Sequence, residues 1–298
     1  MENKKTNILC ESLQLCRYQF LNHFMTVKTV TILVLLAVVI SFHLRPVARF
    51  AIAQGISVAP WIFPFMPSDY MLQIILVAGA VFLMSDAPFK NENHFYLLYR
   101  AGTISWSIGT ILYMIVVSVV YTLSIWGIAL FSLADVIQFD GEWGKILGTL
   151  AQNPRVLVDY EIPMVFNYTI FQYTPIRATI YSILLECGCI LWIGLAIYIG
   201  NEFLKHYMGI SIAFAYLFLD VMIYNVMSRN VYRYSPLSIC QLGYFNGDMR
   251  RVGITLSYAV KFFSISIGCF VLFILVAGNR KRIWRYLKES RRKQACKM

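Results

Sequence analysis

Long apolar runs are the feature that most constrains the fold of this 298-residue chain. Six runs approach or exceed the length of about 20 helical residues that crosses a hydrocarbon core of about 30 Å. The chain is 59% hydrophobic and only 14% charged, too little polar surface for a water-soluble globule of this length. We therefore predict an all-α, polytopic membrane protein with six transmembrane helices, at about residues 27–44, 70–84, 107–133, 178–200, 210–226 and 257–278.

The residues before the first span carry an amphipathic pattern. Apolar side chains recur every three or four positions, which is the spacing of one face of a helix, at Leu9, Leu13, Cys16, Phe20 and Phe24. Because Lys28 and the first span follow directly, we expect this helix to lie at the membrane surface. The alternative is a solvated leader.

Two connections are too apolar for free solution. Residues 45–69 are rich in proline and aromatic residues, and we expect a broken loop that dips into the membrane interface. Residues 227–256 include the run SPLSICQLGYF, which we expect to be partly re-entrant. The predicted domains are a surface helix at 1–26, a single six-span domain at 27–278 and a basic tail at 279–298.

The net charge of +11 is distributed beside the predicted spans. This placement favours contact with membrane lipids over nucleic acid. With the N-terminus inside, the segments on the inner side hold 16 Lys and Arg residues and the outer loops hold 9. The positive-inside rule therefore places both termini in the cytoplasm, mostly because of the tail.

The stretch Ser85–Gly102 separates the second and third spans and has the signals of a short helix. Asn91 or Asn93 can cap its start, and Gly102 can take the left-handed conformation that ends a helix. The charge count places this stretch in the cytoplasm. The alternative is an interfacial loop whose aromatic residues enter the lipid headgroups.

The sequence shows no catalytic or cofactor motif. GEWGK at Gly141–Lys145 has two residues between its glycines, whereas a P-loop has four and ends in Ser or Thr after the Lys. The four histidines are scattered, and the seven cysteines form no C-x-x-C pair. We expect no enzymatic activity, metal or cofactor in this chain.

Three charged residues lie within predicted spans, and a charge in hydrocarbon costs at least about 2.5 to 3.5 kcal/mol. They are Glu186, Asp220 and Lys261, all toward the outer side. Our hypothesis is that Lys261 neutralises one of the two acids and helps to close the outer end of a pathway. The alternative is that these charges are structural and have no role in transport.

Taken together, these features resemble the ABC-2 type permeases, the membrane subunits of type-2-like ABC transporters. The similarity rests on the six spans, the surface helix, the helix between spans two and three and the bent outer loop. VFLMSDAPF from Val81, YRAG-x-x-x-W from Tyr99, EWGKILGTLA from Glu142 and SPLSICQL from Ser235 are similar to a bacterial subgroup encoded apart from its ATPase.

The resemblance implies that the helix between spans two and three is a coupling helix that touches a separate ATPase subunit. The residues carried over for that contact are Asp86, Phe89, Asn91, Glu92, Phe95, Tyr96 and Arg100, with Phe20 and Phe24 packing on the connecting helix.

The implied assembly is a dimer with an identical or sister permease and two copies of the ATPase, which would hold ATP and Mg²⁺. It would export peptides or amphiphiles across a bacterial cytoplasmic membrane. The alternative function is a non-transporting membrane sensor or assembly partner.

Overall fold

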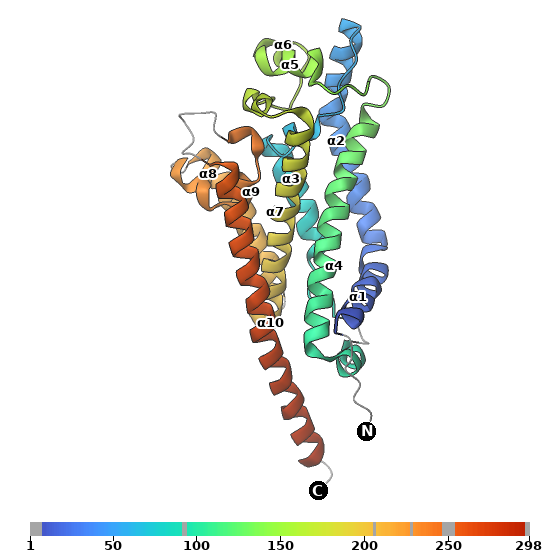
Figure 1. Cartoon of the computed structure of the whole chain (residues 1–298), viewed down its shortest axis with the longest axis vertical. Coiled ribbons are helices and arrows are strands. Elements are labelled where there is room, and N and C mark those ends of the chain that lie inside the picture. The colour runs from blue at the N-terminus through green and yellow to red at the C-terminus, as the bar shows by residue number, and fades with distance from the viewer. Residues whose placement is uncertain (1–7, 91–93, 205–206, 227–228, 246–253, 296–298) are drawn as a thin grey trace.

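The computed structural model describes residues 8–90, 94–204, 207–226, 229–245 and 254–295. Within these ranges the chain forms helices joined by turns and loops, with no strand and one isolated bridge between Val58 and Ile137. The long helices run side by side in a bundle (Figure 1). The prediction of an all-α fold is confirmed.

Among the described residues, five helices are long and apolar enough to cross a membrane: α2 (Val27–Gln54), α4 (His94–Ser132), α7 (Pro175–Phe203), α8 (Met208–Asn225) and α10 (Leu256–Ala295). A sixth apolar helix, α3 (Tyr70–Met84), has the predicted bounds but only 15 residues. The chain therefore has the character of a multi-pass membrane protein. Its last helix runs without a break past residue 278, where we expected a span to give way to a tail.

The expected break after residue 44 is wrong, because α2 continues to Gln54 with Pro46 inside it. Proline removes one backbone donor but does not forbid a helix whose next turns are held by packing. Val47, Phe50 and Ala51 are buried and supply that packing. The helix ends at Gly55, whose φ of 64° is in the left-handed region.

The N-terminal helix α1 (Ile8–Gln19) packs along the first part of α4, followed by a π-helical turn, η1 (Phe20–Phe24). Gly109 permits this close contact, because a Cβ there would lie 2.8 Å from the Cβ of Leu15. Leu15, Ser12 and Gln19 are buried in the contact. Leu9 and Leu13, from the predicted apolar face, remain exposed.

Short helices and loops gather at the end of the bundle opposite the two chain termini, at the top of Figure 1. They are η2 (Phe63–Phe65), α5 (Gly144–Gln152), α6 (Pro154–Asp159), η3 (Tyr168–Gln172), η4 (Arg229–Tyr234), α9 (Pro236–Ile239) and η5 (Leu242–Tyr244). Asp69 joins the start of α3 to the loop before η3, since its carboxylate accepts from the backbone N–H of Leu72 at 2.9 Å and of Val165 at 3.2 Å. Ser68 accepts from the N–H of Gly243 at 3.0 Å.

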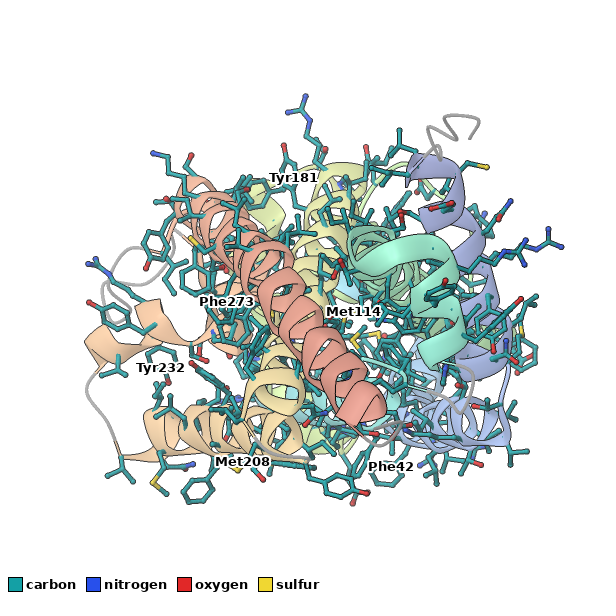
Figure 2. The ribbon with its side chains drawn as sticks, turned by 90° about the horizontal axis from the view of Figure 1, so that it is seen from below. Phe42, Met114, Tyr181, Met208, Tyr232 and Phe273 are labelled. Atoms are coloured by element: carbon teal, nitrogen blue, oxygen red, sulfur yellow. The ribbon has the colours of Figure 1, made fainter. Side chains whose placement is uncertain are left out.

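The bundle is apolar outside as well as inside. Figure 2 shows Met114 near the middle and Phe42 at the rim. Met114 is fully buried, whereas Phe42 is 68% exposed. An apolar rim of this kind is suited to lipid rather than water.

Candidate functional site

The connection between α3 and α4 lies at the end of the bundle that carries both termini (Figure 1). Its first residues, Ser85–Lys90, form a compact turn after α3. Lys28, at the start of α2, donates to the hydroxyl of Ser85 and to the carboxylate of Asp86, each at 2.7 Å. This pair ties the turn to α2.

Asn201, near the end of α7, holds the same turn from the other side. Its side-chain amide donates to the carbonyl oxygen of Ser85 at 3.1 Å and to that of Ala87 at 2.8 Å. Its side-chain oxygen accepts from the N–H of Gly209, in the first turn of α8, at 2.9 Å. One side chain therefore links the turn to both α7 and α8.

A glycine pair makes this arrangement possible. A Cβ on Gly200 would lie 2.5 Å from the Cα of Gly209, so the backbones of α7 and α8 meet here. A side chain at either position would separate the two helices. Without that close contact Asn201 could not reach Gly209.

A second charged pair fastens the end of the turn. The ammonium group of Lys90 lies 2.5 Å from the carboxylate of Glu202 on α7. The side chain of Glu202 is 1% exposed and that of Lys90 is 34% exposed. Because a buried carboxylate without a counterion is costly, this pair should hold more firmly than a surface ion pair.

Phe89 anchors the turn through its ring. Its φ is 56°, an uncommon value for a residue with a side chain, and it is 3% exposed. The ring centroid lies 5.2 Å from that of His23 and 4.8 Å from that of Tyr113 on α4. Burial lowers the pKa of His23 and so favours the neutral ring. The nearby Asp86 carboxylate opposes this effect in part.

Beyond the turn, a short helix precedes a sharp break at Gly102. The φ of 82° and ψ of 166° at this glycine are not helical and divide α4 into 94–101 and a long second part. The positive φ agrees with the predicted left-handed conformation, but the ψ lies outside it. Tyr96, Tyr99 and Arg100 on the short helix are exposed.

The residues predicted to contact an ATPase differ in their exposure. Asp86, Tyr96 and Arg100 are exposed, but Phe89 is buried and cannot touch a partner in this conformation. Asn91 and Glu92 lie outside the described residues, as does the side chain of Phe95.

The predicted packing residues Phe20 and Phe24 stack on each other, with ring centroids 4.8 Å apart. His23, which lies between them in sequence, makes the ring contact with the turn. The sequence analysis did not single out His23 for this role.

The two predicted intramembrane acids are buried, but their partners differ from those expected. Glu186 accepts from the side-chain amide of Gln73 at 2.9 Å. Asp220 accepts from the hydroxyls of Ser235 and Ser238, each at 2.6 Å. These serines belong to the apolar run that we predicted to be re-entrant, and Ser235–Gly243 is buried against the bundle.

The proposed ion pair of Lys261 is therefore wrong. Its side chain is exposed, and it forms no ion pair with Glu186 or Asp220 among the described residues. Neutral donors bond to one oxygen of each acid, at lower desolvation cost than a buried ammonium would carry. Lys261 can extend its ammonium group along the exposed face of α10 toward the membrane interface.

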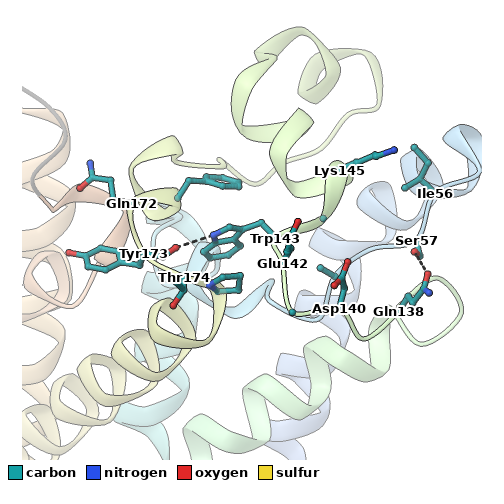
Figure 3. Close-up of a pocket in the computed structure, with 15 residues that line it drawn as sticks. Ile56, Ser57, Gln138, Asp140, Glu142, Trp143, Lys145, Gln172, Tyr173 and Thr174 are labelled. Atoms are coloured by element: carbon teal, nitrogen blue, oxygen red, sulfur yellow. Dashed lines mark hydrogen bonds between the residues drawn. The ribbon is translucent and has the colours of Figure 1, made fainter.

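A hollow of about 870 Å³ opens at the other end of the bundle (Figure 3). Trp143 forms one wall and donates from its indole N–H to the carbonyl of Tyr173 at 3.1 Å. Asp140, Glu142 and Lys145 also line it, giving it mixed charge. The segment GEWGK thus contributes to this hollow, and Gly144 takes a positive φ of 72° within it.

No cluster of three or more His, Cys, Asp or Glu side chains suited to a metal was found in the described ranges. In comparisons with known proteins, no family model, no curated protein and no solved structure matches the chain. Function is therefore inferred from the geometry of the chain.

The side chains that hold the turn could not have been selected from sequence alone. Asn201, Lys28 and Glu202 are common surface residue types near helix ends, and each is more than 55 positions from the turn in sequence. The one available signal is their position in the chain, since all three lie near the ends of apolar helices.

Proposed function

We propose that this chain is the membrane-spanning permease subunit of an ATP-driven ABC exporter of the ABC-2 type. The observation that carries the proposal is the turn Ser85–Lys90. It is fastened to α2 by Lys28, to α7 by Asn201 and Glu202 and to α8 through Gly209. The adjoining helix 94–101 presents exposed Tyr96, Tyr99 and Arg100.

Such an arrangement can transmit movement. Exposed aromatic and cationic side chains are favourable anchors for a protein partner. Force applied to the helix would reach several spans together, because the turn behind it is bonded to three of them. The partner would be a separate ATPase in two copies, which binds ATP and Mg²⁺, and closure of the ATPases would switch access from one side to the other.

The proposal includes six spans, with α3 as the sixth. Fifteen helical residues extend about 22 Å, which is short of a core of about 30 Å. The buried apolar segment Phe63–Asp69 precedes α3 and can complete the crossing within the protein. The helix α1 would lie at the membrane surface, with Leu9 and Leu13 in contact with lipid.

The proposed setting is a bacterial cytoplasmic membrane with both termini in the cytoplasm and a second permease, identical or sister, beside this one. Peptides or amphiphiles are the proposed cargo. The alternative is a sensor or assembly partner that uses the same exposed helix to bind a protein without ATPase activity.

The test is co-purification of the tagged chain from its native membrane, with mass spectrometry to identify a protein that has nucleotide-binding motifs. We expect Tyr96→Ala with Tyr99→Ala to reduce recovery of the ATPase by about tenfold, as for loss of a central aromatic anchor. Phe139→Ala is the matched control, because Phe139 and Tyr99 are each 78% exposed. It should leave recovery unchanged.

Asn201→Ala separates docking from transmission. This variant should retain the ATPase, because Asn201 does not face the partner, but lose the stimulation of ATP hydrolysis by cargo. The proposal fails if no ATPase is recovered. Recovery of a kinase or regulator in its place, sensitive to the same tyrosines, would support the sensor alternative.

A further inference from the structure

A groove of about 690 Å³ runs between α2 and α4 on the outside of the bundle. Its walls are mainly apolar, and one cation, Arg45, stands at one end. The lining residues are Val34, Ala37, Val38, Ser41, Phe42, Arg45, Ser124, Gly127, Ile128, Phe131 and Ser132. Among the residues that the structure describes, no carboxylate lines it. A long apolar slot with a cation at one end matches the shape and charge of an anionic amphiphile.

The depth of the groove matches one leaflet of a bilayer. Arg45 is 18 residues beyond Val27, the start of α2, which places it about 27 Å along a helix in a core of about 30 Å. The groove extends from Arg45 back to Val34, about 16 Å of helix and close to half of that core. Arg45 thus stands at headgroup level and the apolar walls at acyl-chain level.

The serine hydroxyls inside the groove do not disfavour an apolar chain, because they form hydrogen bonds within the protein. The hydroxyl of Ser124 donates to the carbonyl of Val120 at 2.7 Å, and that of Ser132 donates to the carbonyl of Ile128 at 2.8 Å. Ser41 and Ser132 also bond each other at 2.9 Å. With these hydroxyls satisfied by the protein, the floor presents mainly carbon.

Two residues give the groove its selectivity. Gly127 leaves open space, since a Cβ there would meet no atom within 4 Å. Arg45 is exposed and forms no ion pair with a described residue, so its planar guanidinium can bind a phosphate through two parallel hydrogen bonds. If a second copy of the chain packed on this groove through the same face, it would bring its own Arg45 and no carboxylate from that face to pair with the cation.

We propose that this groove binds an anionic phospholipid of the leaflet opposite the termini, with the phosphate on Arg45 and an acyl chain between α2 and α4. The proposal needs only the membrane character of the helices. It does not depend on a transport function.

The test is native mass spectrometry of the full chain, purified in detergent and exchanged with phosphatidylglycerol or with phosphatidylcholine of the same acyl chains. Arg45→Gln should reduce retention of phosphatidylglycerol by about tenfold, as expected for loss of a charge-assisted hydrogen bond. Arg177→Gln is the matched control, because Arg177 is also exposed, on the first turn of α7 at the same end of the bundle. It should retain the lipid.

A second variant, Gly127→Leu, fills the slot and leaves Arg45 in place. It should reduce retention of both lipids, which a purely electrostatic surface would not do. The proposal is overturned if Arg45→Gln retains phosphatidylglycerol, or if Arg177→Gln loses as much. Disulfide-linked dimers of Phe131→Cys in native membranes would also overturn it, because the groove would then face a second copy.

Discussion

Glu186 and Asp220 show how the chain places carboxyl groups among apolar helices. Neutral side chains donate to both: Gln73 to one oxygen of Glu186, and Ser235 with Ser238 to one oxygen of Asp220. A buried group that loses its only donor carries its full desolvation penalty, about 1 to 3 kcal/mol and more when charged. Stability should therefore depend on these donors rather than on Lys261.

We predict that Gln73→Leu lowers the free energy of unfolding by about 1 to 3 kcal/mol, because the Glu186 oxygen loses its donor. Lys261→Gln should change it by less than about 0.5 kcal/mol, as for other exposed positions. Unfolding of the purified variants in mixed micelles, followed by circular dichroism, measures both. If Lys261→Gln destabilises the protein more than Gln73→Leu does, the ion pair of Lys261 with a buried acid must be reconsidered.

For single residues, the sequence indicated which buried charges need compensation, but it did not indicate which side chains compensate them. The position of a charge within an apolar run identified Glu186 and Asp220 as residues that must be compensated, and both are buried. Their partners are uncharged residues as many as 113 positions away, and no local pattern connects them. The burial of Phe89 was missed for the same reason, since His23 and Tyr113, which enclose it, come from other elements.

Among the elements, the short helix 94–101 depends on the backbone of one residue. Gly102 has φ 82° and ψ 166°, a region open almost only to glycine, and a Cβ there would meet no atom within 4 Å. The cost of a side chain at this position is therefore backbone strain alone. That cost is on the order of 1 to 3 kcal/mol.

We predict that Gly102→Ala destabilises the protein by about 1 to 3 kcal/mol, or straightens α4 so that the helix 94–101 leaves its place. Gly127→Ala is the control, because Gly127 also has open space but lies inside regular helix. It should be neutral or stabilising by up to about 1 kcal/mol. Thermal unfolding measures the first effect, and hydrogen exchange at residues 96–101 measures the second.

Elements were predictable where local signals and packing agree. The bounds of α3 followed from an apolar run at residues 70–84, and the structure adds that Asp69 caps the helix. The extension of α2 past Pro46 was missed, because proline is a local signal against a helix and the two arginines are signals against a membrane span. The compensating burial of Val47 and Phe50 is a tertiary effect. The contact of α1 with α4 was missed because Gly109 is an unremarkable glycine in an apolar run.

For the whole molecule, the two ends of the bundle differ in composition and in content. One end carries both termini, the turn Ser85–Lys90 and the helix 94–101, and the other carries the short helices and the hollow of Figure 3. The proposed function requires the first end to face the cytoplasm. The charge excess supports that orientation, with 16 Lys and Arg residues against 9, but nine of the 16 belong to residues 279–298.

Orientation can be measured with single cysteines at matched exposed positions. In a chain with Cys10, Cys269 and Cys296 replaced by serine, Phe139→Cys should react with an impermeant maleimide in intact cells. Tyr99→Cys should react only after the membrane is opened. Labelling of Tyr99→Cys in intact cells would contradict the orientation and with it the proposed contact with a cytoplasmic ATPase.

The same pair of cysteines tests the physical cause. Removing residues 279–298 leaves 7 Lys and Arg residues at the end that carries the termini, against 9 at the other, so the bias toward one orientation disappears. We predict that both cysteines then become partly reactive in intact cells. If the shortened chain keeps the original labelling pattern, the helices themselves set the orientation, and the basic tail is free to serve another purpose, such as binding anionic lipid at the inner surface.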